Sequence, residues 1–562
     1  MKSALRYLFA GLAVIGVLAV QAQPAPAQAT VSAKGFVIYA SPTSRKLLQG
    51  EAPDLKARAN HWRDLLAARG SSYTIVTHPR QLAAVPIGIA LILPSAVALD
   101  DEEKRLITER MEAGEGLLAT GMPGTLDVTG KPVSPAFLEK TFQVSAKATP
   151  RGDRGFLITV GDTPLTYTLA PGTRVWVGKE KFATPLLSES GAGYLSDWSR
   201  STGETGLVAF ATVGKSRRAL MGWTEAAWDG QAADFRKLAE AALDWVEGKP
   251  SAWLRTWPWP YRGAVTIGID SLWKFENAPR AASRLAERGV HGSFHFVSDQ
   301  VEPNAAIIRD LAKGGQAVGG FGDSTQPFGG KSEREQKVRV ERMVDEFHRV
   351  LGADFPVAGL RAPQGVTDAG TEKAAASLDY IVDIGRVDSL VPSLSENGHL
   401  VLLAASANFA ATNTAEMISS ALDVAMRKAF VGGYAFVGFD LAGLAQDSPM
   451  ETALAQSLEG SKALGALWMG SATEVAQWWR ERSAIKVTST WKPADSILDL
   501  DVTVAQPLQF GASIQLSPPQ GLLPRLEDPP AGVQLQNAGG ATALVLTGLP
   551  AGTHRLRVRF VP

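Results

Sequence analysis

A regular alternation of short apolar runs and amphipathic segments between residues 262 and 440 constrains this chain more than any other feature. The apolar runs predict strands, and the segments between them have the apolar spacing of helices. Strands that alternate with helices form parallel sheets. We therefore predict a (β/α) barrel over residues 261–483, with a site at the carboxyl ends of its strands. The predicted strands lie near 263–270, 292–297, 316–321, 357–361, 379–383, 399–403 and 433–439.

The N-terminal part of the chain has a second alternation. Apolar runs predict strands at 35–39, 73–77, 87–94 and 117–121, with helices at 55–69 and 100–113. We predict a flavodoxin-like α/β domain over residues 33–246. Its pattern resembles the class I amidotransferase-like and trehalose-utilisation-like folds. Amidotransferase activity requires a cysteine nucleophile and the chain has no cysteine, so this resemblance implies a scaffold or binding module.

Two further segments follow from composition. Residues 247–260 contain three tryptophans among prolines, which predicts a linker packed between domains, with stacking on sugar rings as the alternative. Residues 487–562 alternate with the two-residue period of half-exposed strands between turns rich in proline and glycine. We predict a small antiparallel β-sandwich there, which is either a packing module or a carbohydrate-binding accessory.

The N-terminus predicts the location of the protein. Lys2 and Arg6 precede an apolar run over 8–20 and an Ala-x-Ala end at 27–29, which is the pattern of a secretory signal peptide over residues 1–29. No later run of about 20 apolar residues predicts a membrane segment in the mature chain. We therefore expect a periplasmic or secreted protein.

Charge and cysteine content exclude other functions. Lys+Arg and Asp+Glu are both 56, and this balance does not favour a nucleic acid as partner. The absence of cysteine excludes disulfides and thiolate chemistry.

Three barrel segments carry motifs. A buried strand ends at Asp270, a glycine-rich segment covers 314–327, and Gly-Leu-Arg-Ala-Pro-Gln-Gly covers 359–365. In this order and spacing they resemble the NodB-homology polysaccharide deacetylases, whose motifs read T-F-D-D-G, H-S/T-x-x-H-P and R-x-P-Y. The resemblance covers about 261–483. It implies a metal-dependent carbohydrate deacetylase fold, with a polysaccharide or oligosaccharide as partner.

The family's machinery is a metal site with an acid and a base. The second Asp of the first motif and the two His hold a divalent metal, which lowers the pKa of bound water to about 7. The first Asp is the general base, the Arg of the third motif orients it, and a late His is the general acid.

Most of these positions differ in this chain. The resemblance places Ile269 and Asp270 at the Asp pair, so that the base is missing, and places Phe321 and Thr325 at the two histidines. Arg361 matches the third motif, with Gln364 in place of its tyrosine, and Phe439 or Asp440 stands where the acid would be. We predict Asp270, Arg361 and Asp440 as candidate catalytic residues, and Asp323, Phe321 and Gln364 as candidate substrate-binding residues. We predict no metal and no cofactor.

A relocated metal site at His291 and His295 is not favoured. The segment 290–297 that contains both residues reads as a strand, where positions four apart are separated by about 13 Å. Both rings would have to reach within about 2.1 Å of one zinc ion. We therefore predict core or site-lining roles for both.

The remaining carboxylates leave the function open. Asp270, Asp323 and Asp440 all follow predicted strand ends, and two carboxylates that flank a sugar can hydrolyse a glycosidic bond. The alternative is that Asp270 pairs with Arg361 while the other two cap turns. Our main hypothesis is a catalytically degenerate, saccharide-binding protein of cell-envelope or exopolysaccharide metabolism. An active hydrolase, either a residual deacetylase or a glycosidase, and a scaffold without ligand are the alternatives.

Overall fold

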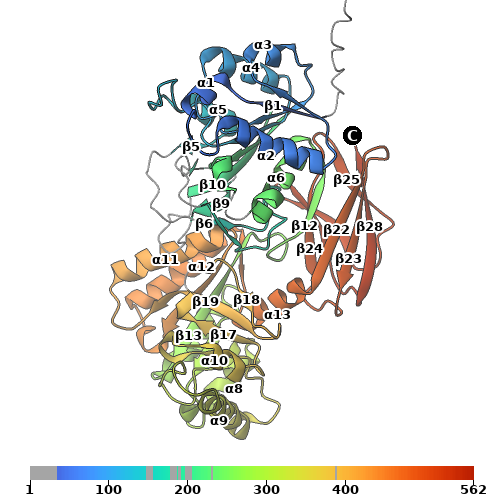
Figure 1. Ribbon diagram of the computed structural model, residues 1–562. Coiled ribbons are helices and arrows are strands. Elements are labelled where there is room, and N and C mark those ends of the chain that lie inside the picture. The colour runs from blue at the N-terminus through green and yellow to red at the C-terminus, as the bar shows by residue number, and fades with distance from the viewer. Residues whose placement is uncertain are drawn as a thin grey trace, which may run out of the picture.

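The computed structural model describes residues 35–146, 156–177, 186–187, 191–195, 205–228, 232–386 and 389–562. The chain forms an N-terminal α/β domain, a central barrel and a C-terminal β-sandwich, which follow one another from blue to red in Figure 1. The predicted signal peptide lies outside the described residues. Among the helices that are described, none has the length and apolar character needed to cross a membrane.

The N-terminal domain is built on a parallel sheet in the order β2-β1-β3-β4-β11. With β11 as the fifth strand, this is the flavodoxin-like order 2-1-3-4-5. The predicted α/β fold and its first four strands are confirmed. These strands are β1 (Phe36–Tyr39), β2 (Tyr73–Val76), β3 (Ala90–Leu93), β4 (Leu117–Thr120) and β11 (Ser216–Met221).

An antiparallel extension continues this sheet beyond β11. It consists of β5 (Ser145–Ala146), β6 (Phe156–Thr159), β7 (Arg174–Trp176), β8 (Leu186–Leu187), β9 (Gly191–Leu195) and β10 (Thr205–Val213). The helices of the domain are α1 (Pro42–Leu47), α2 (Leu55–Ala68), α3 (Pro79–Ala84), α4 (Asp101–Glu112), α5 (Ala136–Phe142) and α6 (Ala232–Val246). Separate apolar cores, one with Trp62 of α2 and one with Ile107 of α4, show that both faces of the sheet are covered.

The central domain is a closed parallel barrel. Strand β13 pairs with β14 on one side and with β20 on the other, which closes the order β13-β14-β15-β16-β17-β19-β20. The predicted barrel and its strands are confirmed. They are β13 (Gly263–Ser271), β14 (Ser293–Phe296), β15 (Ala317–Gly320), β16 (Gly359–Arg361), β17 (Tyr380–Asp383), β19 (Val401–Phe409) and β20 (Tyr434–Asp440).

Helices surround this barrel, and two short strands add to it. The helices are α7 (Ala278–Ala286), α8 (Ala305–Lys313), α9 (Glu333–Leu351), α10 (Ala369–Ala374), α11 (Ala415–Phe430), α12 (Pro449–Leu464) and α13 (Ala472–Ser483). Strand β18 (Ser393–Leu394) pairs with β19, and β21 (Leu467–Met469) pairs with β13.

Alternation along the barrel strands separates two apolar layers. Val265, Ile267 and Ile269 of β13 lie in the core between the strands and the helices. Tyr380 and Phe436 lie in a second core inside the barrel. The barrel is therefore filled by side chains, and a ligand has access only at its ends.

The C-terminal domain is a sandwich of two antiparallel four-stranded sheets, in the orders β12-β24-β27-β26 and β22-β23-β28-β25. Its strands after the barrel are β22 (Ile485–Lys492), β23 (Ile497–Val504), β24 (Ala512–Ser517), β25 (Leu523–Glu527), β26 (Val533–Ala538), β27 (Ala541–Leu546) and β28 (Gly552–Val561). Strand β12 (Ser251–Leu254) falls within the predicted linker and pairs antiparallel with β24. This part of the linker is thus an edge strand of the sandwich.

Tryptophans pack the junction between the domains. Trp257 of the linker is fully buried and donates from Nε1 to the carbonyl of Gly432 at 2.9 Å. Trp478 of α13 donates to the carbonyl of Thr256, also at 2.9 Å. Trp257, Trp478 and Trp479 share the core that fills the barrel, so packing accounts for the burial of these rings.

Candidate site at the carboxyl end of the barrel

Asp270 is the central residue of the candidate site. It lies near the end of β13, where its register partners are His295 on β14 and Asp440 on β20. Strands that pair lie about 4.8 Å apart. Two carboxylates and an imidazole are therefore brought together from three neighbouring strands.

Ile269 is not part of this site, and placing it there was wrong. Its side chain is fully buried between the strands and the helices, because neighbouring residues of a strand point to opposite faces. The preceding residue on the inner side is Gly268. A Cβ added there would lie 2.0 Å from Cζ of Phe436, so that ring uses the space that a side chain at 268 would need. Phe439, like Ile269, faces the helices. Of the two residues predicted for the acid position, only Asp440 at the end of β20 therefore remains a candidate.

Arg361 at the end of β16 holds the Asp270 carboxylate. Its Nε donates to Oδ1 of Asp270 at 3.2 Å, and its Nη2 donates to Oδ1 of Asn408. The guanidinium also lies over the Phe436 ring, with Cζ 5.1 Å from the ring centre. The pairing with Arg361 that the sequence left as an alternative for Asp270 is present. It is also the contact that the family resemblance implies for the general base, rather than for a metal ligand.

Burial and charge act in opposite directions on Asp270. Loss of water around the carboxyl raises its pKa, Arg361 lowers it, and Asp440 raises it again. The net result is a raised pKa. Protonated Asp270 is therefore easier to reach than an exposed aspartic acid would be.

His295 lies on the inner side of β14 and is fully buried. Its Nε2 is 3.1 Å from the Tyr380 hydroxyl, and its Nδ1 has no hydrogen-bond partner among the described residues. Burial, with a contribution from the Arg361 charge, lowers its pKa to about 3. His295 is therefore neutral at pH 7, as expected for a core or site-lining histidine. His291 lies outside β14, half exposed, with Nδ1 3.5 Å from the Glu474 carboxylate.

The carboxylates of Asp323 and Asp440 each have partners of their own. The Asp323 carboxylate lies in the loop after β15, where it pairs with Arg339 at 2.8 Å and Arg342 at 3.2 Å. Asp440 accepts from the backbone N–H of Ala442 at 3.0 Å, at the start of the 3₁₀ turn η6 (Leu441–Gly443). Asp440 thus caps a turn, as the alternative predicted, whereas Asp323 forms ion pairs with α9.

Phe321 and Gln364 lie on two neighbouring loops. Phe321 is buried, and its N–H donates to the carbonyl of Phe296 at 2.7 Å. Gln364 is exposed with a left-handed φ of 57° in η4 (Pro363–Gly365), directly after Arg361. Thr325 is exposed in the loop after β15. Binding roles for Phe321 and Gln364 remain predictions.

Sequence reasoning missed two residues at this end of the barrel. Asn408 reaches Arg361 because β19 continues through a register shift after Ala405, beyond the predicted strand at 399–403. Trp273 follows β13 and has 56% of its surface exposed. Its position three residues after Asp270 was the available signal, since the loops that follow barrel strands build the site and aromatic side chains commonly line ligand pockets.

The residues present do not fit the family's metal site. Phe321 and Thr325 stand at the positions of the two histidine ligands, and neither side chain is a ligand that zinc uses. His295 directs Nε2 toward Tyr380. Within the described ranges, no group of three or more His, Cys, Asp or Glu side chains is placed to hold a metal ion. We therefore derive no chemical step through a metal.

Comparisons with known proteins found one family match and several similar solved structures. The family model described as polysaccharide deacetylase matches residues 261–382. Solved structures with similarity include a polysaccharide deacetylase homologue from Mycobacterium smegmatis, at 17% identity and TM-score 0.34, covering 41% of this chain and 94% of that one. A CE4 family pseudoenzyme from Bacillus anthracis shares 16% identity at TM-score 0.29, covering 39% and 66%. A family 4 acetyl xylan esterase from Clostridium thermocellum shares 16% at TM-score 0.28, covering 38% and 89%. No curated protein matches the chain.

The central domain is thus a closed parallel (β/α) barrel. A carboxylate and a guanidinium lie at the carboxyl ends of its strands, where such barrels have their sites. Within this domain, residues 261–382 match the polysaccharide deacetylase family model, in agreement with the predicted motif order.

Proposed function

We propose that this protein binds a saccharide at the carboxyl end of its barrel and does not carry out metal-dependent deacetylation. One observation carries the proposal: Phe321 and Thr325 stand where the family has its two metal-binding histidines, and among the described residues no group of three or more His, Cys, Asp or Glu side chains is placed to hold a metal ion. The match of residues 261–382 to the polysaccharide deacetylase family model supports a saccharide as the ligand class. As part of the same proposal, the protein acts in the periplasm or outside the cell, in envelope or exopolysaccharide metabolism.

The polar and aromatic groups around the mouth support saccharide binding. Nη1 of Arg361 and Oγ of Ser271 are buried without hydrogen-bond partners among the described residues. Sugar hydroxyls both donate and accept hydrogen bonds and would satisfy such groups. The exposed Trp273 adds an apolar surface of the kind that packs on a sugar ring.

Titration of an N-acetylglucosamine hexamer into the protein, followed by calorimetry, tests the binding. We expect measurable affinity that falls about tenfold in Trp273→Ala, because a buried aromatic contact commonly contributes this much or more. Phe510→Ala is the matched control, since Phe510 is 39% exposed in the C-terminal domain. Equal affinities for the wild type and Trp273→Ala would remove the mouth as the binding surface.

Metal analysis and an acetate-release assay on N-acetylated polymers test the lost deacetylation. We expect no stoichiometric metal and no acetate. Tightly bound zinc together with acetate release that disappears in Asp270→Ala would contradict the proposal.

A metal-free glycosidase is the second candidate, because Asp270 and Asp440 are register partners and Asp270 has a raised pKa. A general acid with a raised pKa beside a second carboxylate is the arrangement that such enzymes use. Release of reducing ends from a glycan panel, lost in both Asp270→Asn and Asp440→Asn, would favour it. Absence of release in the wild type would eliminate it.

A further inference from the structure

We infer that a cationic pocket beside the barrel mouth is a second ligand site, which recognises the carboxylate or phosphate group of an anionic saccharide. The pocket has a volume of about 500 Å³ and lies between the loop after β15 and the N-terminal half of α9. The inference rests on the proposed saccharide binding and specifies the chemical class of the ligand.

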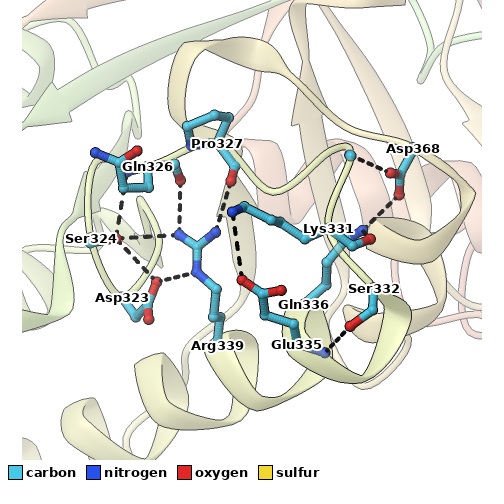
Figure 2. A network of polar contacts seen from close by, with 11 residues as sticks. Asp323, Ser324, Gln326, Pro327, Lys331, Ser332, Glu335, Gln336, Arg339 and Asp368 are labelled. Atoms are coloured by element: carbon cyan, nitrogen blue, oxygen red, sulfur yellow. Dashed lines mark hydrogen bonds and ion pairs between the residues drawn. The ribbon is translucent and has the colours of Figure 1, made fainter.

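One of the lining residues, Arg339, is the centre of a network of polar contacts, shown in Figure 2. The Nε of Arg339 donates to Asp323, and its Nη1 donates to the carbonyl of Pro327, both at 2.8 Å. Its Nη2 donates to the carbonyl of Gln326 at 2.8 Å and to Ser324 at 3.3 Å. Only 9% of the Arg339 side chain is exposed. Arg339 therefore fixes the loop and is not the group that meets a ligand.

Charge in the pocket is unbalanced toward the positive. Four cationic side chains and two carboxylates line it, an excess of two positive charges. The two carboxylates are already engaged, because Asp323 pairs with Arg339 and Arg342, and Glu335 lies 3.8 Å from Lys331. The positive end of the α9 dipole adds to this field. An anion entering the pocket would meet no uncompensated negative charge.

Three cations remain accessible to a ligand. Arg334 is exposed, and no described residue forms an ion pair with it. Arg342 has 66% of its side chain exposed and can keep Asp323 on one face of its guanidinium while it offers its remaining donors. Lys331 is half exposed at the pocket edge. Two guanidinium groups and an ammonium are the set that binds carboxylate and phosphate oxygens.

The loop that lines the pocket also lies beside the mouth of the barrel. Its loop begins directly after β15, the strand next to β16, which carries Arg361. Gly322 of this loop packs on η4, since an added Cβ would lie 3.2 Å from Cγ of Pro363. A saccharide chain at the mouth could thus place an acidic residue in the pocket.

Calorimetry with two matched hexamers tests the inference: an oligogalacturonate, which is acidic, and an N-acetylglucosamine hexamer, which is neutral. We expect Arg334→Glu and Arg342→Glu each to lower the affinity for the acidic hexamer about tenfold or more, since charge reversal replaces attraction by repulsion. Neither should change the affinity for the neutral hexamer. Added salt should lower the affinity for the acidic hexamer only.

Lys337→Glu is the control, because Lys337 is an exposed cation on α9 that does not line the pocket. If it weakens the acidic hexamer as much as the pocket variants do, or if the pocket variants have no effect, the inference is wrong. The proposed function would then stand whenever the neutral hexamer still binds and depends on Trp273. If only the acidic hexamer binds, the pocket remains a proposed site and the mouth is rejected as one. If neither hexamer binds, both proposed sites are rejected. Glucuronate and glucose 6-phosphate are then tested as competitors of the acidic hexamer. Stronger competition by glucuronate indicates a carboxylate ligand, and stronger competition by glucose 6-phosphate indicates a phosphate ligand.

Discussion

The two parallel sheets of this protein each end in a cluster of polar side chains, but only one cluster is open. In the N-terminal domain, Ser95 follows β3, Thr120 ends β4, and Glu225 follows β11 in η1 (Glu225–Ala227). Glu225 Oε1 accepts from Trp62 Nε1 and from Thr120, both at 2.6 Å, and its Oε2 accepts from Ser95. Arg58 donates to Ser95 at 3.1 Å. None of the four polar residues Arg58, Ser95, Thr120 and Glu225 is more than 2% exposed.

The barrel cluster differs in its exposure to solvent and in how many of its polar atoms have hydrogen-bond partners. Asp270 keeps 17% of its side chain exposed, and Arg361, Ser271 and His295 each have a buried polar atom with no partner among the described residues. Both clusters occupy the sheet edge where ligands bind in parallel α/β folds. Position on the fold alone therefore does not define a site. Open access and unsatisfied polar groups distinguish the barrel mouth from a sealed structural network.

The largest expected effect is on the sealed cluster. Glu225→Ala removes the acceptor shared by three buried donors, and we expect a loss of about 3–5 kcal/mol in the free energy of unfolding. Urea unfolding measures this. Glu102→Ala, at an exposed position in α4, is the control and should stay within about 0.5 kcal/mol. A loss below about 1 kcal/mol for Glu225→Ala would show that the cluster is less tightly built than its contacts indicate.

Breaking the Asp270–Arg361 pair should lower the free energy of unfolding by less. Asp270→Ala leaves the Arg361 guanidinium buried without its carboxylate, and we expect about 2 kcal/mol of destabilisation, because solvent reaches Asp270. A double-mutant cycle with Arg361→Ala in urea unfolding should give a favourable coupling of about 1 kcal/mol. Zero coupling would mean that the two charges do not stabilise one another.

Acid should act on the barrel through His295. Its pKa is about 3 in the folded protein, below the ordinary value for histidine, so below about pH 6.5 the unfolded chain takes up a proton that the folded one does not. Stability therefore falls as the pH falls from about 6.5 toward 3. Between pH 7.5 and pH 5, the wild type should lose about 2 kcal/mol more than His295→Gln. Parallel losses in the two proteins would contradict a buried neutral histidine.

The smallest stability effect is expected at the rim of the open cluster. Trp273→Ala should change the free energy of unfolding by less than about 0.5 kcal/mol, because more than half of the ring is already in water. Thermal unfolding checks this beside the binding titration. A loss above about 1 kcal/mol would assign Trp273 to packing instead of ligand binding.

Periodicity predicted the elements well because it reflects burial directly. The barrel strands and the first four strands of the N-terminal domain followed from apolar spacing. The pairing of Asp270 with Arg361 was one of two alternatives that the sequence left open. Assigning Ile269 to the site failed because a shift of one residue along a strand reverses the face. Asn408 was missed because the register shift in β19 has no sequence signal that we recognised.

The sequence by itself determined the α/β class, the barrel and the absence of cysteine chemistry, because apolar period and composition are local properties. Only the tertiary structure decided which polar groups meet. Arg339 comes from α9 to clamp Asp323, and Asn408 comes from β19 to Arg361, contacts that depend on packing between distant segments. The openness of one cluster and the closure of the other are decided in the same way, since exposure depends on what covers a side chain rather than on the residue itself.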